Sequence, residues 1–167
     1  MVAEAPSWQG GVQYDGYDYT ALGAAADRLI LRIIPYAKNV EDFPTEPLEP
    51  LEELYYTLSR VADTVPASRL SVWMTTTGNL WTNGKQGGAV RAQELDSLLE
   101  DPLTQTHYSS RYVCPYLTRN DETSSRVIWY LDADALQQRV KLLSFFGVGQ
   151  ICFSDLTSMS KTLLGAE

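Results

Sequence analysis

The side chains that could do acid–base, nucleophilic or metal chemistry are unevenly supplied in this sequence. Of its 167 residues, 21 are Asp or Glu, one is histidine (His107) and two are cysteines (Cys114 and Cys152). A single histidine excludes a metal site built from several histidines, and a Ser-His-Asp triad would have to use His107. Two cysteines are too few for a disulfide framework and lack metal-ligand spacing, so free buried thiols are expected. We expect no metal and no cofactor.

The acids mostly have a simpler explanation than catalysis. Glu4 lies in the first expected strand, but no partner carboxylate is placed to tune it as a catalytic acid. The four acids between positions 46 and 53 are most simply a solvated loop and the start of a helix. Apart from Glu4, only Asp155, just past the last expected strand, lies near a strand end. Arg32 falls in an expected buried strand, where a cation needs a partner such as Glu4.

Aromatic residues are the other candidates for binding a ligand. The chain has four Trp and ten Tyr, and such rings line sugar-binding clefts as well as ordinary cores. Trp81 lies beside Asn79 in an expected loop after a strand, Trp8 follows the first strand, and Trp129 lies in an expected hairpin. For each tryptophan, a ligand platform and simple packing both remain open.

Charge and hydropathy exclude several classes of function. The formal net charge of -8 argues against a nucleic-acid partner and against docking on an anionic membrane. Apolar runs such as residues 29–35 are far too short to cross a bilayer. The first residues have no basic start and no long apolar core, so no signal peptide is expected. The chain is then either cytoplasmic or a segment cut from something larger.

Short apolar runs alternate with helical patterns along the chain. The runs at 28–34 and 69–75 are nearly continuous, which is typical of strands buried on both faces in a parallel sheet. Residues 51–65 place apolar side chains on one face of a helix, with acids in its first turn. The remaining expectations are strands at 2–6, 111–117, 126–131 and 150–153, helices at 19–27, 89–99, 133–146 and 158–164, and loops at 38–50 and 76–88.

This order predicts an α/β fold with a parallel sheet and right-handed crossovers. A strand–helix unit repeats about four times, and a β-hairpin within residues 103–131 is inserted before the last helix–strand pair. We expect a single domain over residues 1–167.

Five motifs, in order over nearly the whole chain, resemble one family. They are YDYTALG followed by ADRLIL at 17–31, P with RLSV at 66–72, TGNLW at 77–81, VIWY with DA at 127–133, and GVGQI at 147–151. Together they are similar to the family-18 glycoside hydrolases, the chitinase-like barrels, and especially to the short bacterial spore and cell-envelope type.

The resemblance implies that the chain covers strands five to eight, the parallel (β/α) half of a TIM-type barrel. A full barrel typically needs ~250 residues, more than this chain has. Four strands would leave an inner apolar layer and two sheet edges uncovered, so we expect two copies to pair and complete each other's barrel. By the resemblance, the location would be extracellular or in the cell envelope.

The resemblance also implies a mechanism that this chain does not complete. In the family, a Glu in a D-x-x-D-x-D-x-E run protonates the glycosidic oxygen while the substrate's N-acetyl group attacks. That run is absent here, and the nearest fragment, residues 15–18, lacks the third Asp and the Glu. The family's strand-six Tyr and Asp are replaced, although Tyr36 lies one or two positions late. Ser154 stands where the family has a tryptophan.

We therefore expect a domain that is non-catalytic as it stands. It would bind an N-acetylated sugar polymer such as peptidoglycan or chitin, or serve a structural role. The alternatives are the C-terminal part of an active family-18 glycosidase whose acid lies upstream, and an unrelated α/β domain that binds a small ligand. The expected ligand-binding residues are Trp81, Asn79, Trp8, Tyr36, Trp129 and Asp155.

Overall fold

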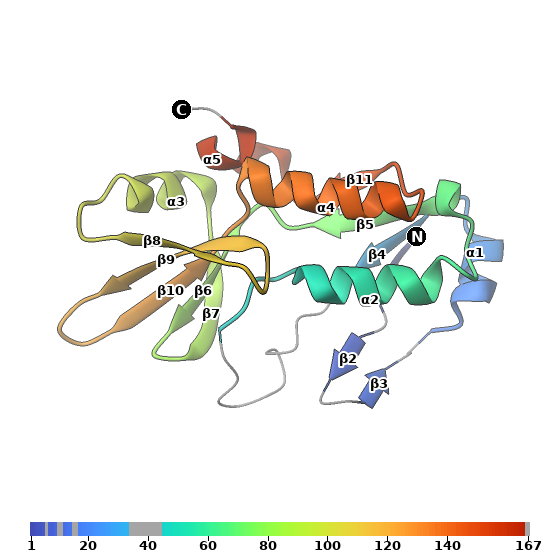
Figure 1. Cartoon of the computed structure of the whole chain (residues 1–167), viewed down its shortest axis with the longest axis horizontal. Coiled ribbons are helices and arrows are strands. Elements are labelled where there is room, and N and C mark those ends of the chain that lie inside the picture. Colours follow the sequence, from blue (N-terminus) through green and yellow to red (C-terminus); the bar gives the residue numbers. More distant parts are fainter. Residues whose placement is uncertain (6, 10–11, 15–16, 34–44, 166–167) are drawn as a thin grey trace.

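The computed structural model describes residues 1–5, 7–9, 12–14, 17–33 and 45–165, and it contains two main sheets joined end to end (Figure 1). The parallel sheet is formed by β1 (Val2–Glu4), β4 (Leu29–Arg32), β5 (Leu70–Met74) and β11 (Ile151–Phe153). The antiparallel sheet is formed by β6 (Gly78–Thr82), β7 (Lys85–Val90), β8 (Gln105–Ser109), β9 (Cys114–Asn120) and β10 (Ser125–Trp129). A short hairpin of β2 (Ser7–Gln9) and β3 (Val12–Tyr14) follows β1. The helices are α1 (Tyr19–Ala25), α2 (Leu51–Val61), α3 (Ala92–Leu99), α4 (Ala133–Phe145) and α5 (Lys161–Leu164).

The parallel sheet has its strands in chain order, β1-β4-β5-β11. Neighbouring strands are in parallel register, with Ala3 opposite Leu31 and Leu31 opposite Val72. Sequential parallel neighbours joined by helices are the arrangement of a (β/α) barrel. The predicted α/β half of a TIM-type barrel is therefore confirmed. Among the described residues, none of the helices has the length and apolar character needed to cross a membrane.

One face of the parallel sheet carries the main core. Helices α2 and α4 lie side by side over this face (Figure 1). Leu31 and Val72 of the strands pack with Leu54 and Leu58 of α2 and with Leu143 of α4, all of them almost fully buried. Glu52 and Glu53 in the first turn of α2 and Arg60 in its last turn suit the helix dipole. Truncating a buried leucine such as Leu58 to Ala is expected to cost about 2–5 kcal/mol.

The opposite face of the parallel sheet is much less covered. Val2 is 53% exposed, and Ile30, Trp73 and Cys152 are only partly buried. Arg28 Nη1 donates to Ser71 Oγ at 3.3 Å on this face. We call this surface, which is the side that would line the interior of a barrel, the inner face.

The expected pairing of Arg32 with Glu4 is not seen. The two residues are register partners on β1 and β4, but both are exposed and no ion pair joins them among the described residues. At the solvated end of an edge pair, water supplies the solvation that a buried cation would have needed from an acid.

The antiparallel sheet is larger than predicted and lies beyond the C-terminal ends of the parallel strands (Figure 1). The predicted hairpin is confirmed as β9 and β10, but β8 was not expected. The predicted loop at 76–88 is wrong, because it forms the hairpin of β6 and β7. Its turn is Asn83-Gly84, with φ of 52° and 76°, a dipeptide that favours tight hairpin turns. Helix α3 covers one face of this sheet through Leu95.

Candidate functional site

The C-terminal ends of the parallel strands are tied together by hydroxyl groups. After β5, the Thr76 backbone N–H donates to Ser154 Oγ at 3.0 Å, and Thr76 Oγ1 donates to the Asp155 carbonyl at 2.9 Å. Ser154, where the resembled family has a tryptophan, thus joins two strand ends. The Asp155 carboxylate accepts from the backbone N–H of Thr157 at 2.8 Å and caps a short 3-10 helix. A ligand-binding role for Asp155 stays a prediction.

The acidic segment before α2 is buried, contrary to the expected solvated loop. Glu46, Glu49 and Glu53 are at most 6% exposed, and only Glu52 has the predicted exposure. Glu52 instead pairs with Arg111 at 3.3 Å. The burial of these acids has a physical cause, because residues 45–50 run between the two sheets at the end of β5, where neighbouring groups replace water.

Glu49 is held by one strand end and lies beside a buried cation. Its Oε1 accepts from the backbone N–H of Thr75 at 3.1 Å and from Thr75 Oγ1 at 2.5 Å. Arg139 of α4 is fully buried and donates from Nη2 to the Glu49 carbonyl at 3.0 Å. Burial raises the pKa of the Glu49 carboxyl, while Thr75 and Arg139 act against that rise.

Two predicted ligand residues anchor the same segment instead of facing solvent. Asn79 and Trp81 are each 3% exposed. Asn79 Nδ2 and Trp81 Nε1 both donate to the carbonyl of Glu46, at 2.8 Å and 3.2 Å. Their side chains are the hydrogen-bond donors that fix residues 45–50 against β6. Direct contact with a ligand stays a prediction for both.

A row of three aromatic rings crosses the antiparallel sheet. Trp129 on β10, Tyr116 on β9 and His107 on β8 are register partners. The Trp129 and Tyr116 ring centroids are 4.5 Å apart, and those of Tyr116 and His107 are 4.9 Å apart and nearly parallel. Trp129 is 5% exposed, whereas Tyr116 and His107 are only partly buried. We call these three residues the aromatic row.

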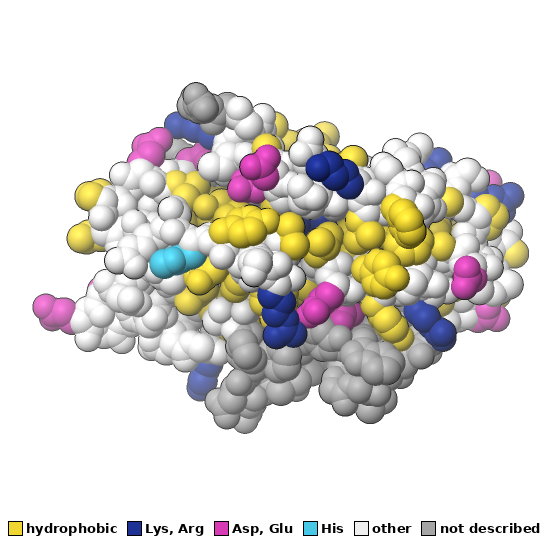
Figure 2. All heavy atoms as spheres, viewed as in Figure 1, with side chains coloured by type: hydrophobic (Ala, Val, Ile, Leu, Met, Phe, Trp, Pro, Cys, Tyr) yellow, Lys and Arg dark blue, Asp and Glu magenta, His cyan; other side chains and the backbone are white. Residues whose placement is uncertain are grey.

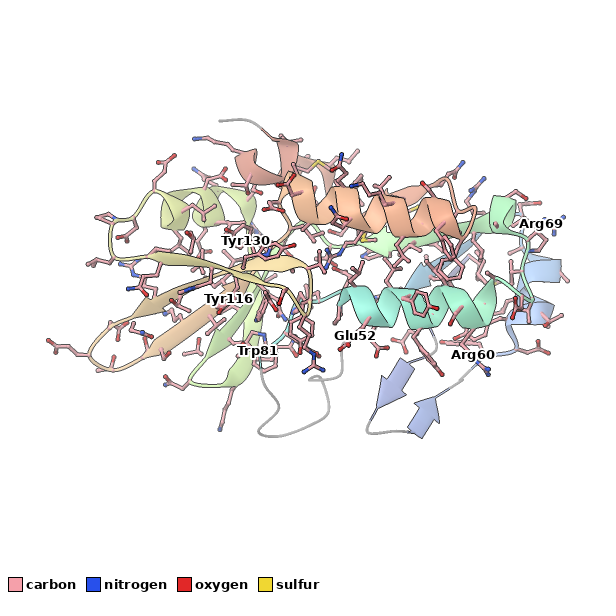
Figure 3. All side chains as sticks on the ribbon, in the orientation of Figure 1. Glu52, Arg60, Arg69, Trp81, Tyr116 and Tyr130 are labelled. Atoms are coloured by element: carbon pink, nitrogen blue, oxygen red, sulfur yellow. The ribbon has the colours of Figure 1, made fainter. Side chains whose placement is uncertain are left out.

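The aromatic row reaches the molecular surface at its His107 end. Figure 2 shows the single histidine at the surface over the antiparallel sheet. Figure 3 shows Tyr116 and Trp81 on this sheet, with Glu52 at the start of α2. His107 Nε2 lies 2.9 Å from Thr118 Oγ1, a hydrogen bond that fixes the plane of the imidazole.

A small cavity of about 10 Å³ lies where Trp129 of the aromatic row meets the segment 45–50. Glu49, Thr75, Cys114 and Trp129 are among its lining residues. The indole N–H of Trp129 has no hydrogen-bond partner among the described residues. Cys114 Sγ donates to the Tyr130 carbonyl at 3.1 Å, and burial raises the pKa of this thiol to about 12.

The structure brings together only some of the predicted ligand residues. Asn79, Trp81 and Trp129 meet around the segment 45–50, whereas Asp155 lies after β11. Trp8 is in β2, and Tyr36 lies outside the described residues. In the part of the chain that the structure describes, no group of three or more His, Cys, Asp or Glu side chains is placed to hold a metal ion.

Four residues of this region were not expected to belong to a site, namely His107, Tyr116, Glu49 and Arg139. The strand that carries His107 reads QTHYS, which lacks the apolar alternation of a half-buried strand. Tyr116 offered a usable signal, because aromatic residues on paired strands often face each other. Burial of Glu49 and Arg139 depends on contacts between distant segments, which spacing does not reveal.

The sequence itself matches no protein-family model and no curated protein. Solved structures nevertheless share its fold. The spore cortex-lytic enzyme SleL of Bacillus cereus has a TM-score of 0.78 at 17% identity, over 97% of this chain and 39% of that chain. A chitinase of Chromobacterium violaceum has 0.77 at 19% identity, over 98% and 53%. A class V chitinase of Pseudomonas fluorescens has 0.74 at 19% identity, over 98% and 54%.

The chain therefore spans about half, or less, of the length of these solved chains. At such identities the likeness establishes the fold alone, and the predicted resemblance to the family-18 glycoside hydrolases is confirmed at that level. This chain has the fold of one part of a chitinase-like barrel.

Proposed function

We propose that this domain binds an N-acetylated glycan of the chitin or peptidoglycan type along the aromatic row and does not cleave it alone. The observation that carries the proposal is the partly exposed pair Tyr116 and His107, in a fold shared with a spore cortex-lytic enzyme and chitinases. Those relatives act, by their names, on spore cortex and on chitin.

The geometry of the row suits a flat sugar ring. The Tyr116 and His107 rings are stacked face to face, with planes that differ by 23°, so the ring at the open end of the row is His107. Trp129 lies on the other side of Tyr116, at an angle of 34°, so Tyr116 is held between two rings. The apolar face of a pyranose packs on such rings, while its hydroxyl groups stay in contact with water.

The non-catalytic part of the proposal rests on the acids. The run D-x-x-D-x-D-x-E, which supplies the proton donor in the resembled family, is absent from these 167 residues. Glu49, which lines the same small cavity as Trp129, is buried in the segment 45–50, as is Glu46. If residues upstream in a longer protein supply the acid, the same chain becomes the glycan-holding half of an active glycosidase.

Binding of an N-acetylglucosamine hexamer, measured by calorimetry, tests this function. The wild-type chain should bind it, and Tyr116→Ala should weaken binding about tenfold, because it removes the ring on which His107 is stacked, a contact of roughly 0.5–1.5 kcal/mol beyond its buried area. Tyr108→Ala is the matched control, because Tyr108 lies on the paired strand, is 56% exposed and is absent from the row. Equal affinity of Tyr116→Ala and wild type would contradict the proposal, as would steady release of reducing ends by this chain.

A second copy of the chain is proposed as the cover of the inner face. Parallel sheets occur almost only with both faces covered, yet here Val2 and Ile30 are left partly or largely exposed. Within the described residues β1 pairs only with β4 and β11 only with β5, so each side of the sheet ends in an open edge. Two copies supply the eight strands that a closed barrel needs. Light scattering at micromolar concentration should give the mass of two chains.

A further inference from the structure

We propose that the glycan stacks on the outer face of His107 and that protonation of this imidazole ring weakens the binding. The inference rests on the glycan-binding function proposed above. It names the ring that the sugar touches and adds a control by pH, because His107 is the one member of the aromatic row that can gain a positive charge.

The aromatic row has one open end. Its three rings lie on neighbouring strands of the sheet, whose order is β7-β6-β10-β9-β8. The ring centroids are 4.5 Å and 4.9 Å apart, which is close to the usual spacing of about 4.8 Å between strands. Since β8 is the last strand of this sheet among the described residues, the row ends at His107. A sugar ring that extends the row lies one strand spacing beyond β8, against the outer face of the imidazole.

The imidazole is fixed from the inner side. One face of the ring packs on Tyr116, and Nε2 is hydrogen-bonded to Thr118 Oγ1 at 2.9 Å. The side chain of His107 is partly buried, and Figure 2 shows it at the molecular surface. A ring that is already held in one plane loses little freedom when a sugar stacks on it, which favours binding.

The charge of His107 has no acidic partner nearby. Histidine is the side chain whose charge ordinarily changes between pH 5 and pH 8. The side chains that face it are uncharged, namely Tyr116 and Thr118 on β9 and Gln105 and Ser109 on the same side of β8. None of the ion pairs between described residues includes His107. A proton on this ring is therefore stabilised by water at its open side.

A stacked sugar removes part of that water. The apolar face of a pyranose gives the positive ring no hydrogen bond in return, and desolvation without a partner disfavours the charged form of a group. Stacking is therefore more favourable on the neutral imidazole. Because linkage is reciprocal, the bound sugar opposes the proton as much as the proton opposes the sugar.

The single histidine makes a direct test possible, because in the untagged chain every histidine signal belongs to His107. Its Cε1–H signal is followed from pH 5 to pH 8 by nuclear magnetic resonance, with and without a saturating N-acetylglucosamine hexamer. The bound hexamer should lower the pH at which this signal shifts. Calorimetry should give about tenfold weaker binding at pH 5 than at pH 8, the factor that corresponds to a change of about one pH unit.

Two variants separate the charge from the ring. His107→Phe keeps an aromatic ring at the end of the row but takes up no proton, so its affinity for the hexamer should be nearly the same at pH 5 and pH 8. Any pH dependence that remains in this variant comes from other groups, such as Glu49. His107→Ala should bind weakly at both pH values, because the open ring is gone. Circular dichroism checks that both variants are folded.

The outcomes distinguish this inference from the function on which it rests. If the wild-type chain binds the hexamer equally well at pH 5 and pH 8, or if the His107 signal keeps its pH profile when the hexamer is bound, the inference is wrong and the glycan function stands. If the wild-type chain binds the hexamer at neither pH, the glycan function fails and this inference fails with it.

Discussion

The carboxyl group of Glu49 loses its hydration where the segment 45–50 passes between the two sheets. Desolvation is the largest influence on it and raises its pKa above the ordinary value of 4.5, against the hydrogen bonds of Thr75 and the charge of Arg139. Burying a carboxylate is expensive unless partners compensate it, and here the compensation is incomplete.

A pH dependence of stability follows from this raised pKa. The folded chain holds the Glu49 proton more tightly than the unfolded chain. The stability that this proton adds to the fold is therefore fully present below about pH 4.5 and is lost as the pH rises through the folded-state pKa. Glu49→Gln has no such proton. The unfolding free energy of wild type minus that of the variant should therefore decrease from pH 4 to pH 7. Urea unfolding of both proteins at the two pH values measures this difference, and an unchanged difference would contradict the shift.

Among the elements, the hairpin of β6 and β7 depends on a particular turn. Asn83 and Gly84 both have positive φ, and no atom lies within 4 Å of a Cβ placed on Gly84. A substitution at Gly84 is therefore opposed by backbone conformation and not by crowding.

Gly84→Ala should lower the unfolding free energy by about 1 kcal/mol, the usual penalty for a side chain in the left-handed region. Gly88→Ala is the matched control in the same hairpin, because it also has no neighbour within 4 Å and lacks a positive φ. Thermal or urea unfolding of the two variants gives the comparison. Equal loss in both would show that the turn conformation is not the cause.

The strands differ in how well the sequence predicts them. The strands of the parallel sheet were predictable because β4 and β5 are nearly continuous apolar runs. Strand β8 was not, because its residues are polar and it is recognisable only by its partner β9. The Gly and Asn residues of the β6–β7 hairpin predict a loop by composition, whereas the dipeptide Asn83-Gly84 is itself a hairpin signal.

The site was less predictable than the fold. Trp129 and Trp81 lie in one buried cluster, whereas the sequence left both packing and ligand contact open for each of them. Glu49 and Arg139 are 90 residues apart in the chain and meet only in the folded state. Spacing along one segment cannot show such a contact, because it depends on how two sheets pack against the connection between them.

At the scale of the whole molecule, the proposed pairing through the inner face can be tested by a substitution. If a second copy covers it, a charge placed there should prevent pairing, since the charge would be buried without a partner. Val2→Glu should then shift the chain toward the monomer mass in light scattering. Phe145→Glu is the control, because Phe145 is 79% exposed on the outer side of α4 and should leave the mass unchanged. A monomeric wild type would contradict the pairing.

The two open sides of the parallel sheet carry a further consequence for how copies add to one another. In the proposed pairing, the free side of β11 on one copy would meet the free side of β1 on the next, which is a head-to-tail contact. Such a contact closes on itself when the rotation per copy is half a turn, and otherwise it continues as an open fibre. Polymerisation and ring closure would thus be two outcomes of the same pair of open strand edges, and the curvature of the sheet would determine which one forms.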